Sequence, residues 1–398
     1  MPKDLLRSAR TSLRFRIFEP LCYALASSRA TFTGNRRIQR KVLLVSDQKV
    51  YTSEQQFAPL LANRRELGKQ FGVVLRYQRL SEILARPKQR LAGYDVVGLK
   101  ISYRTPAAEA VRITQSIREA IPEGTKLVYF DGDDDPCVLW PEVASIVDLY
   151  IKKHLLRDRS AYKKHRTGKT NLTDYVAETF GFDFTENIIP TSRPLQDRQI
   201  QKLALGWNIG ADDKIRKLRN KHRAIPPASA KNLDIVCRAT VPADSWMAPL
   251  RSMVIPQIDA LRDSFDVLTP NEHVTQDVYY EEMLRSRICV SPFGYGEICW
   301  RDFEAILCGC VLVKPEMSHL ETAPDIFVPN ETYIPVRWDY LDLGERLKDL
   351  LERPEECERI RTRAAQVLHD YVSARSVLKS FDGLLALAGA PRTERPTT

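Results

Sequence analysis

The stretch SPFGYGEICWRDFEAILCGCVLVK, residues 291–314, decides the fold expected for this chain. An apolar segment, residues 288–290, precedes it and predicts a buried strand. A Pro/Gly turn follows, then a helix expected from near Glu297 to Gly309, then a second apolar strand over residues 311–313. This order points the helix N-terminus at the carboxyl edge of a parallel sheet, where free N–H groups favour an anion.

The same alternation of strands and helices extends through two long parts of the chain. Strands are expected at residues 42–45, 73–76, 95–101, 126–130, 149–152, 233–237 and 333–336. Helices are expected at residues 54–70, 81–86, 105–120, 143–146, 249–263, 278–285, 341–352, 354–371 and 377–387. The pattern predicts an α/β protein with two Rossmann-like, doubly wound parallel sheets.

Composition shifts divide the chain into four expected parts. Pro226-Pro227 and the small residues after it mark the boundary between the two repeating parts. The expected divisions are a basic arm at 1–40, an N-terminal domain at 41–225, a C-terminal domain at 226–375, and a helix with a tail at 376–398.

The net charge of +9 is concentrated in two segments. Residues 1–41 carry a net charge of +8 and residues 152–169 carry +7, which leaves about −6 for the rest. Arg7, Arg10 and Arg14 recur at helical spacing among apolar residues, a pattern that suits an anionic membrane surface; a solvated or disordered arm is the alternative. Neither segment interleaves aromatic residues with its charges, so nucleic acid is not an expected partner.

Composition also restricts the compartment. No apolar run reaches the roughly 18–20 residues of a membrane span, and the N-terminus lacks the cleavage pattern of a secretory signal. Eight cysteines are too few for a disulfide scaffold in a chain of 398 residues. Cys299, Cys308 and Cys310 cluster, but buried thiols explain them better than zinc, because no CxxC or nearby HxxxH accompanies them. We expect a cytoplasmic protein, with a peripheral position on the inner membrane face as a further option.

Arg301 and Glu304 are the leading candidate site residues. They lie three positions apart, so they share one face of the expected helix. Arg301 could bind a phosphate anion, or it could pair with Glu297 one turn earlier. Glu304 stands among apolar neighbours and needs partners, which could be sugar hydroxyls or Arg301 alone.

Further candidates lie at the same sheet edge. Lys314 and Arg238 each follow an expected strand and could contact phosphate, although a surface position suits both. A phosphate could approach Gly294 and Gly296 closely, although a plain turn explains them almost as well. His319 follows the strand that carries Lys314 and could reach a sugar; it could also be a bystander. The resulting binding set is Arg238, Gly294, Gly296, Glu297, Arg301, Glu304, Lys314 and His319.

An acidic loop, Asp131-Gly-Asp-Asp-Asp-Pro136, follows the fourth expected strand of the first domain. Its carboxylates could bind a divalent metal, cap the next helix, or supply a base that deprotonates an acceptor. Crowded like charges raise at least one carboxyl pKa toward neutrality. Asp131 is nearest the strand end and Asp133 next, so these two are the candidates for such a base.

One run of residues carries a family resemblance. The pattern Arg301-x-x-Glu304-Ala305, then Cys308-Gly309-Cys310-Val311, then Val313-Lys314, resembles the C-terminal domain of GT-B glycosyltransferases. It is most similar to the exostosin-like and CgeB-like families, over about residues 285–372. The resemblance implies a nucleotide-sugar donor as substrate and no cofactor. It also implies that Arg301 neutralises the departing diphosphate and that Glu304 accepts hydrogen bonds from the ribose.

One departure from the family pattern bears on mechanism. Retaining GT-B enzymes often carry E-x7-E, but the position eight before Glu304 is Gly296, with Glu297 one place out of register. This favours the exostosin-like, inverting type of transfer over a retaining one. Because GT-B enzymes generally need no metal, the resemblance also favours a base over a metal site in the acidic loop, and we expect no metal. The reaction expected is transfer to a glycan or lipid-linked acceptor, with Asp131, Asp133 and Arg301 as the catalytic groups. The alternatives are an epimerase or phosphorylase of the same fold, and a non-catalytic protein that binds membrane or nucleic acid.

Overall fold

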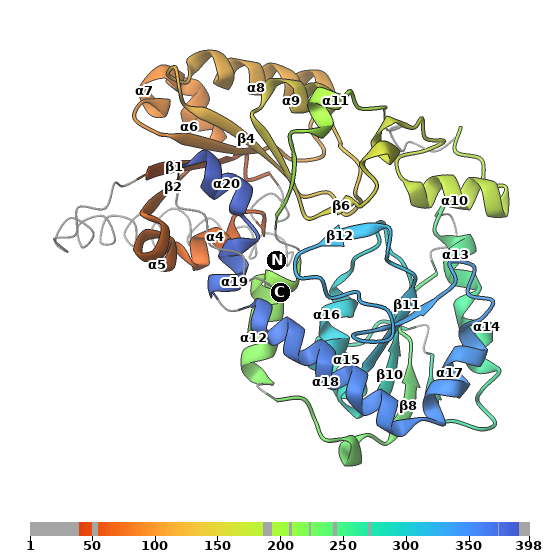
Figure 1. Cartoon of the computed structure of the whole chain (residues 1–398). Coiled ribbons are helices and arrows are strands. Elements are labelled where there is room, and N and C mark those ends of the chain that lie inside the picture. The colour runs from red at the N-terminus through yellow and green to blue at the C-terminus, as the bar shows by residue number, and fades with distance from the viewer. Residues whose placement is uncertain are drawn as a thin grey trace, which may run out of the picture.

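The computed structural model describes residues 40–49, 55–185, 193–206, 209–222, 224–241, 245–269, 272–372 and 374–389. Two α/β units make up this part of the chain, as Figure 1 shows with the N-terminal unit above the C-terminal one. The expected basic arm, apart from Arg40, and the expected tail from residue 390 onward lie outside the described residues.

The N-terminal unit is built on a six-stranded sheet with the order β2-β1-β3-β4-β5-β7. Every neighbouring pair is parallel; Val42, for example, faces Leu75 on one side and Val96 on the other. The central strands are buried along their whole length, which explains their continuous apolar runs. The strands are β1 (Arg40–Ser46), β2 (Val73–Arg79), β3 (Val96–Lys100), β4 (Lys126–Asp131), β5 (Leu149–Lys152) and β7 (Leu203–Leu205).

Helices and helical turns connect these strands and extend toward the second unit. The single helix predicted over 54–70 is divided, because Asn63, with φ −103° and ψ 16°, leaves the helical conformation between α4 and α5. The elements are α4 (Ala58–Ala62), α5 (Arg64–Glu66), η2 (Leu67–Phe71), α6 (Leu80–Ala85), α7 (Pro87–Leu91), α8 (Ala107–Ala120), α9 (Pro141–Ile146), η3 (Arg159–Lys163), α10 (Asn171–Phe180), α11 (Asp197–Ile200), η4 (Ile209–Ala211) and α12 (Asp213–Lys221).

The C-terminal unit has a five-stranded parallel sheet with the order β13-β11-β10-β8-β9. Ile288 faces Ile235 and Val311, so the strands predicted around the 291–314 stretch are neighbours. The elements are η5 (Ala228–Ala230), β8 (Leu233–Val236), α13 (Ala248–Ser252), α14 (Val254–Asp259), β9 (Val267–Leu268), α15 (Gln276–Arg285), β10 (Ser286–Val290), α16 (Trp300–Leu307), β11 (Val311–Pro315), β13 (Ile334–Val336), α17 (Leu343–Leu351) and α18 (Pro354–Tyr371).

The helix that follows β10 starts later than predicted. Cys299 is the N-cap of α16, and its backbone N–H donates to Asp302 Oδ2 at 3.0 Å in a capping box. Glu297 therefore lies in the loop before α16 and not in its first turn. The predicted end is confirmed, because α16 stops at Leu307 and Gly309 adopts a φ of 72°.

A short antiparallel ladder joins the two units, and the sequence pattern did not reveal it. Strand β6 (His154–Leu156) from the N-terminal unit pairs with β12 (Leu320–Thr322) from the C-terminal unit. Arg157 extends this junction, because its backbone N–H donates to the His319 carbonyl at 2.8 Å and its Nη2 to the Leu320 carbonyl at 3.0 Å. The units therefore share main-chain hydrogen bonds close to the carboxyl edges of both sheets.

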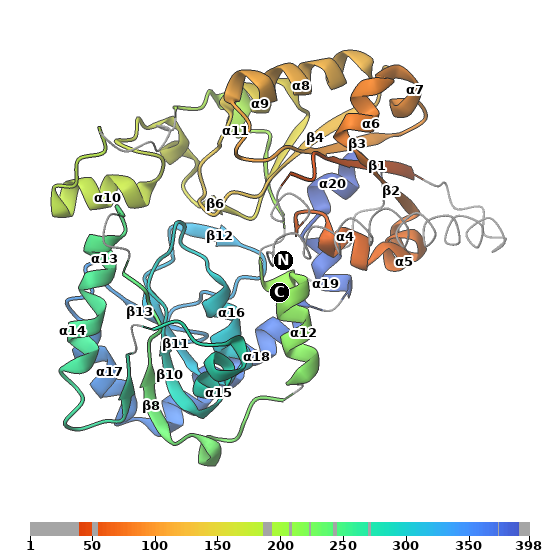
Figure 2. The ribbon, with the colours of Figure 1, turned by 180° about the vertical axis from the view of Figure 1, so that it is seen from behind.

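The end of the chain crosses back to the first unit. After α18, the helices α19 (Ala374–Lys379) and α20 (Asp382–Leu387) lie against the N-terminal unit, as the views from both sides agree (Figures 1 and 2). The Phe381 ring packs 6.5 Å from Phe130 of β4, and Gly383 faces Leu149 and Ala204 closely. The one helix predicted over 377–387 is thus two short helices.

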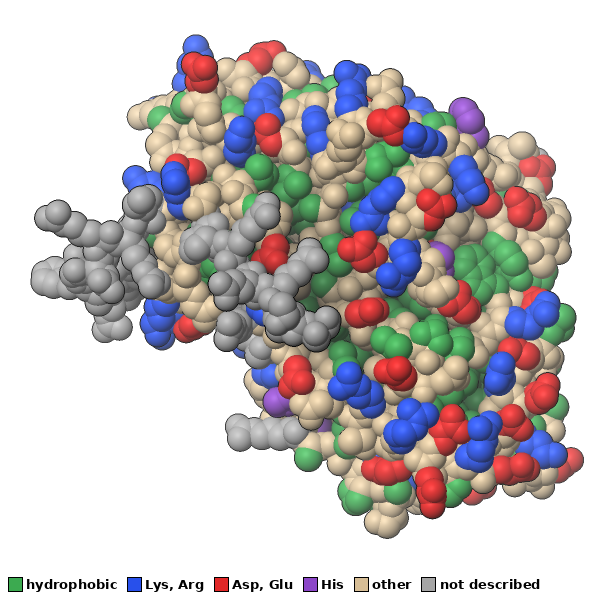
Figure 3. All heavy atoms as spheres, viewed as in Figure 1, with side chains coloured by type: hydrophobic (Ala, Val, Ile, Leu, Met, Phe, Trp, Pro, Cys, Tyr) green, Lys and Arg blue, Asp and Glu red, His purple; other side chains and the backbone are tan. Residues whose placement is uncertain are grey.

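The outer surface carries charges of both signs, which intermingle over both units on the face shown in Figure 3. Among the helices of the described residues, none combines the length and the apolar character that a bilayer crossing requires.

Candidate functional site

Arg301 lies in the first turn of α16, and its guanidinium makes fewer hydrogen bonds to the described residues than a buried guanidinium normally does. Its Nη2 donates to the Arg238 carbonyl at 2.8 Å, at the end of β8. Its Nε and Nη1 are buried and have no hydrogen-bond partner among the residues that the structure describes. Buried donors are normally paired, so this guanidinium has free capacity for an acceptor.

Arg251, on α13, is a second cation that the sequence pattern did not single out. Its Nε donates to the Phe293 carbonyl at 2.9 Å and its Nη1 to the Thr240 carbonyl at 2.7 Å. Burial lowers the pKa of Arg251, and the neighbouring Arg301 charge lowers it further. In the described part of the chain neither guanidinium forms an ion pair, so the edge of the C-terminal sheet has two unmatched positive charges.

The glycines of the β10–α16 loop have different roles. A Cβ atom on Gly294 would lie 3.5 Å from Arg251 Nη2, so this glycine stands beside the cation pair. A Cβ atom on Gly296 would lie 1.5 Å from the Asp134 carbonyl oxygen of the other unit. Contact with the N-terminal unit, rather than approach of a phosphate, explains why no side chain fits at position 296.

Glu304 is 2 % exposed and already saturated with partners. The hydroxyls of Tyr279 and Tyr280 each donate to its carboxylate at 3.0 Å, and Lys214 forms an ion pair with it at 2.5 Å. The suggested pairing of Glu304 with Arg301 is therefore not the one that forms, because Lys214 supplies the positive charge.

Two predicted phosphate ligands point elsewhere. Lys314 is fully buried, where its Nζ donates to the Glu297 carbonyl at 2.6 Å and pairs with Asp302 at 3.1 Å. Arg238 forms a two-pronged ion pair with Glu282 and donates to the Glu272 carbonyl at 2.9 Å. Both predictions need correcting, because these cations neutralise carboxylates of their own unit.

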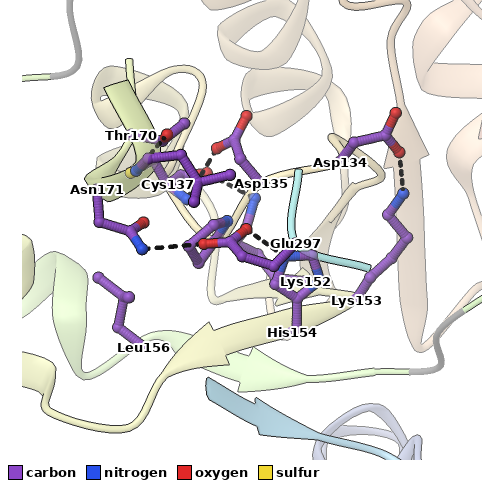
Figure 4. A network of polar contacts seen from close by, with 12 residues as sticks. Asp134, Asp135, Cys137, Lys152, Lys153, His154, Leu156, Thr170, Asn171 and Glu297 are labelled. Atoms are coloured by element: carbon purple, nitrogen blue, oxygen red, sulfur yellow. Dashed lines mark hydrogen bonds and ion pairs between the residues drawn. The ribbon is translucent and has the colours of Figure 1, made fainter. Parts of the chain in front are cut away.

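Glu297 lies at the junction of the units and is completely buried. Its Oε1 accepts a hydrogen bond from Asn171 Nδ2 at 3.0 Å and lies 3.3 Å from His319 Nε2. Figure 4 shows Glu297 between Asn171 and His154, whose Nε2 is 3.8 Å from Glu297 Oε2. Burial alone would raise the pKa of Glu297, but His319, His154 and Asn171 lower it below its usual value. Burial also lowers the pKa of His154 to about 3.

The acidic loop of the N-terminal unit is matched against the basic run 152–169. Each of its four carboxylates forms an ion pair with a lysine from that run, and Figure 4 shows the pair of Asp134 with Lys153. The pairs are Asp131–Lys152 at 3.0 Å, Asp133–Lys169 at 2.7 Å, Asp134–Lys153 at 2.7 Å and Asp135–Lys169 at 2.8 Å. The basic run 152–169 therefore neutralises the neighbouring acidic loop.

This pairing determines what the loop can do chemically. Burial alone would raise the pKa of Asp131, but Lys152 and Lys100 lower it far below its usual range, and the Tyr150 hydroxyl donates to the same carboxylate at 2.7 Å. The geometry gives no support to Asp131 as a base. Burial, reinforced by the Asp133 charge, raises the pKa of Asp135 to about 6. No group of metal-binding side chains suited to an ion is present among the described residues.

Comparisons with known proteins agree with the architecture. Residues 229–381 match the model of a family described as glycosyl transferase-like. No curated protein matches this chain. The part of the chain over residues 229–381 is therefore similar to that family. The predicted α/β class, with a parallel sheet in each of two units, is confirmed.

Solved structures with a related arrangement have low sequence identity. A glycosyltransferase from Rickettsia africae ESF-5 is 11 % identical, with 88 % of this chain and 99 % of that chain covered and a TM-score of 0.45. A UDP-N-acetylglucosamine 2-epimerase from Listeria monocytogenes, described as putative, is 11 % identical, with 90 % and 100 % covered and a TM-score of 0.45. The pneumococcal O-GlcNAc transferase GtfA, in complex with UDP and GlcNAc, is 12 % identical, with 78 % and 59 % covered and a TM-score of 0.40. At these TM-scores the likenesses carry no inference about activity.

Proposed function

We propose that this protein is a glycosyltransferase that takes its sugar from a nucleotide-sugar donor, with the donor diphosphate bound by Arg301 and Arg251. One observation carries the proposal: the Arg301 guanidinium is buried, and two of its nitrogen atoms have no partner within the described part of the chain. A buried cation that lacks partners is unfavourable unless an anion completes it. A diphosphate supplies several acceptor oxygens and the missing negative charge.

The position of this cation pair suits the chemistry of transfer. Negative charge develops on the leaving nucleoside diphosphate as the bond to the sugar breaks, and fixed donors stabilise that charge most strongly where water is excluded. The N-terminus of α16 adds its dipole on the same side. Glu304, three residues after Arg301, is our candidate for binding the ribose of the donor. A ribose hydroxyl would replace the Tyr279 hydroxyl as a hydrogen-bond donor to the Glu304 carboxylate.

The remaining features of the proposal concern the acceptor and the compartment. The departure from E-x7-E favours an inverting transfer. We propose in addition that the transfer needs no metal and that the acceptor is a glycan or a lipid-linked glycan. The charged arm at 1–40 suits a peripheral position on an anionic membrane face inside the cell. The junction between the units, where β6 meets β12, is where donor and acceptor would meet.

Nucleotide binding tests the central claim. Thermal unfolding of the full chain is measured with UDP, GDP, ADP and CDP, and a ligand at 100 times its Kd should add about 2.7 kcal/mol to the free energy of unfolding. Arg301→Gln should lose this shift, because the diphosphate loses its buried partner. Arg346→Gln is the control, since the Arg346 side chain is 52 % exposed and remote from the cation pair in sequence. If none of the four nucleotides raises the melting temperature, the proposal fails.

Product analysis separates transfer from the alternatives on the same fold. Incubation with UDP-glucose, UDP-N-acetylglucosamine or GDP-mannose should release the nucleoside diphosphate from one of them. Conversion of the sugar to its epimer while it stays attached to the nucleotide would instead identify an epimerase.

A further inference from the structure

His319 sits at the junction of the units in a setting that fixes its orientation. Its backbone carbonyl accepts the Arg157 N–H at 2.8 Å, and its ring meets Trp338 edge-on with centroids 5.1 Å apart. Its Nε2 lies 3.3 Å from Glu297 Oε1. Trp338 is held in turn, because its Nε1 donates to the Glu316 carbonyl at 2.9 Å.

The partner of Nε2 determines the tautomer. Glu297 is buried and held in its charged form by the groups around it, so its oxygens can only accept hydrogen bonds. The hydrogen must therefore be on His319 Nε2, which leaves a lone pair on Nδ1. Nδ1 is buried and finds no hydrogen-bond partner in the described ranges, while the side chain as a whole keeps 23 % exposure.

We infer that His319 is the catalytic base of the proposed transfer and that Glu297 is its positioning residue. This inference rests on the proposed function. A carboxylate on one ring nitrogen and a free lone pair on the other is the arrangement that orients a histidine and stabilises its protonated form. His319 replaces Asp131 in the role of base, because the Asp131 carboxylate is bound by Lys152 and Tyr150.

One proton and two electron pairs move in the transfer. His319 Nδ1 takes the proton of the acceptor hydroxyl, and the oxygen electron pair forms the new bond to the anomeric carbon of the donor. The bond from that carbon to the diphosphate oxygen breaks, and its electrons leave with the nucleoside diphosphate, whose charge Arg301 and Arg251 stabilise. The imidazolium, paired with Glu297, then returns its proton to water.

Other charged and titratable groups lie around the pair of Glu297 and His319. His154 lies 3.8 Å from Glu297 on the side of the N-terminal unit, and its neighbours include Lys153 and Asp134. Arg157 approaches from β6 but donates to the carbonyls of Ser318 and Leu320. Within the described residues Glu297 is thus the one carboxylate in contact with the His319 ring.

Turnover with water as the acceptor tests the inference in the full chain. Release of nucleoside diphosphate from UDP-glucose, UDP-N-acetylglucosamine and GDP-mannose is measured for wild type, His319→Ala, Glu297→Gln and the control His369→Ala, whose side chain is 65 % exposed. His319→Ala should lower the rate by about 100-fold or more while the Kd for UDP or GDP stays unchanged. Imidazole added to the buffer should restore part of that loss, and Glu297→Gln should lower the rate less than His319→Ala.

Other results would overturn the assignment. A rate for His319→Ala equal to that of His369→Ala, a parallel loss of nucleotide affinity, or no rescue by imidazole each removes His319 from the chemistry. Nitrogen NMR of the histidine-labelled chain gives a readout without turnover: a hydrogen on Nδ1 instead of Nε2 contradicts the tautomer. If wild type neither binds a nucleotide nor releases one, the proposed function itself has failed, and the inference falls with it.

Discussion

The carboxyl edges of the two sheets handle charge in opposite ways. At the N-terminal edge, four carboxylates face the basic run, and each has a lysine partner at 2.7–3.0 Å. At the C-terminal edge, the hydrogen bonds of Arg301 and Arg251 to described residues all go to backbone carbonyls. The first edge is densely charged and internally neutralised, while the second has few charges but leaves them unmatched.

The two edges differ in which charges already have partners within the described protein. Dense charge in the sequence drew attention to residues 131–135 and 152–169, yet those segments satisfy each other. An unmatched buried cation lowers the stability of the free protein, and a bound anion would offset that cost. The comparison predicts that substitutions at the two edges have opposite effects on stability.

The largest effect is expected at the neutralised edge. Lys152→Met should lower the free energy of unfolding by about 3–5 kcal/mol, because it leaves the Asp131 carboxylate buried and unpaired. Chemical denaturation of the full chain measures this. Lys163→Met is the matched control, since its ion pair with Asp197 is half exposed and should contribute less than about 1 kcal/mol. Equal losses for the two variants would show that the Asp131–Lys152 pair is not a stabilising contact.

The second effect is a pH dependence at the junction between the edges. The pKa of His154 is lowered to about 3 in the folded protein, from an ordinary value of 6.5. The stability it contributes is therefore complete above pH 6.5 and is lost as the pH falls, because the unfolded chain binds the proton first.

Between pH 7 and pH 5 this histidine should account for about 2 kcal/mol of lost stability. Denaturation curves of wild type and His154→Gln at both pH values measure it. The His154→Gln variant should show a flatter slope, whereas His369→Gln, at an exposed position, should keep the slope of wild type. A slope that His154→Gln leaves unchanged would contradict the burial of a neutral ring.

The third effect has the opposite sign and belongs to the unmatched edge. Arg301→Met should raise the free energy of unfolding of the ligand-free protein by about 1 kcal/mol, because a buried cation with two unpartnered nitrogens is removed. Thermal unfolding without nucleotide measures the change, and Arg346→Met serves as the exposed control. A large loss of stability would mean that Arg301 has partners in solution and is a structural residue.

The smallest effect is expected between the edges. Arg159→Ala removes an ion pair with Glu321 that crosses the β6–β12 junction, but both side chains are about one-third exposed or more. Its loss should change stability by less than about 1 kcal/mol, as denaturation would show. A loss of more than about 1 kcal/mol would mean that this one ion pair contributes much of the stability of the contact between the units.

Much of the fold could be predicted because apolar periodicity is local. The runs at 42–45, 126–130 and 288–290 belong to strands that are buried on both faces, so their residue types alone identify them. Strands β6 and β12 were missed because each has three residues and forms only by pairing with the other, 163 positions apart or more. Their sequences carry no periodic signal of their own.

The candidate site could be predicted in part. The position of Arg301 at a helix start after a buried strand could be predicted, because both elements have local sequence signals, while its role in binding an anion stays a prediction. Arg251 was missed because it reaches the same place from α13 through tertiary packing, and no spacing in the sequence relates it to Arg301. Lys314 and Arg238 were predicted to contact phosphate, but in the fold they pair with Asp302 and Glu282. The sequence could not show this, because these partners come together only when the chain folds.

The return of α19 and α20 to the first unit has a consequence for how the protein is made. Phe381 and Gly383 complete the packing of β4 and β5, although they lie some 230 residues or more beyond those strands. During synthesis the first unit emerges from the ribosome long before these helices exist, so one side of it stays uncovered until translation is nearly finished. Shortening the chain at its end should therefore disturb the part that was made first.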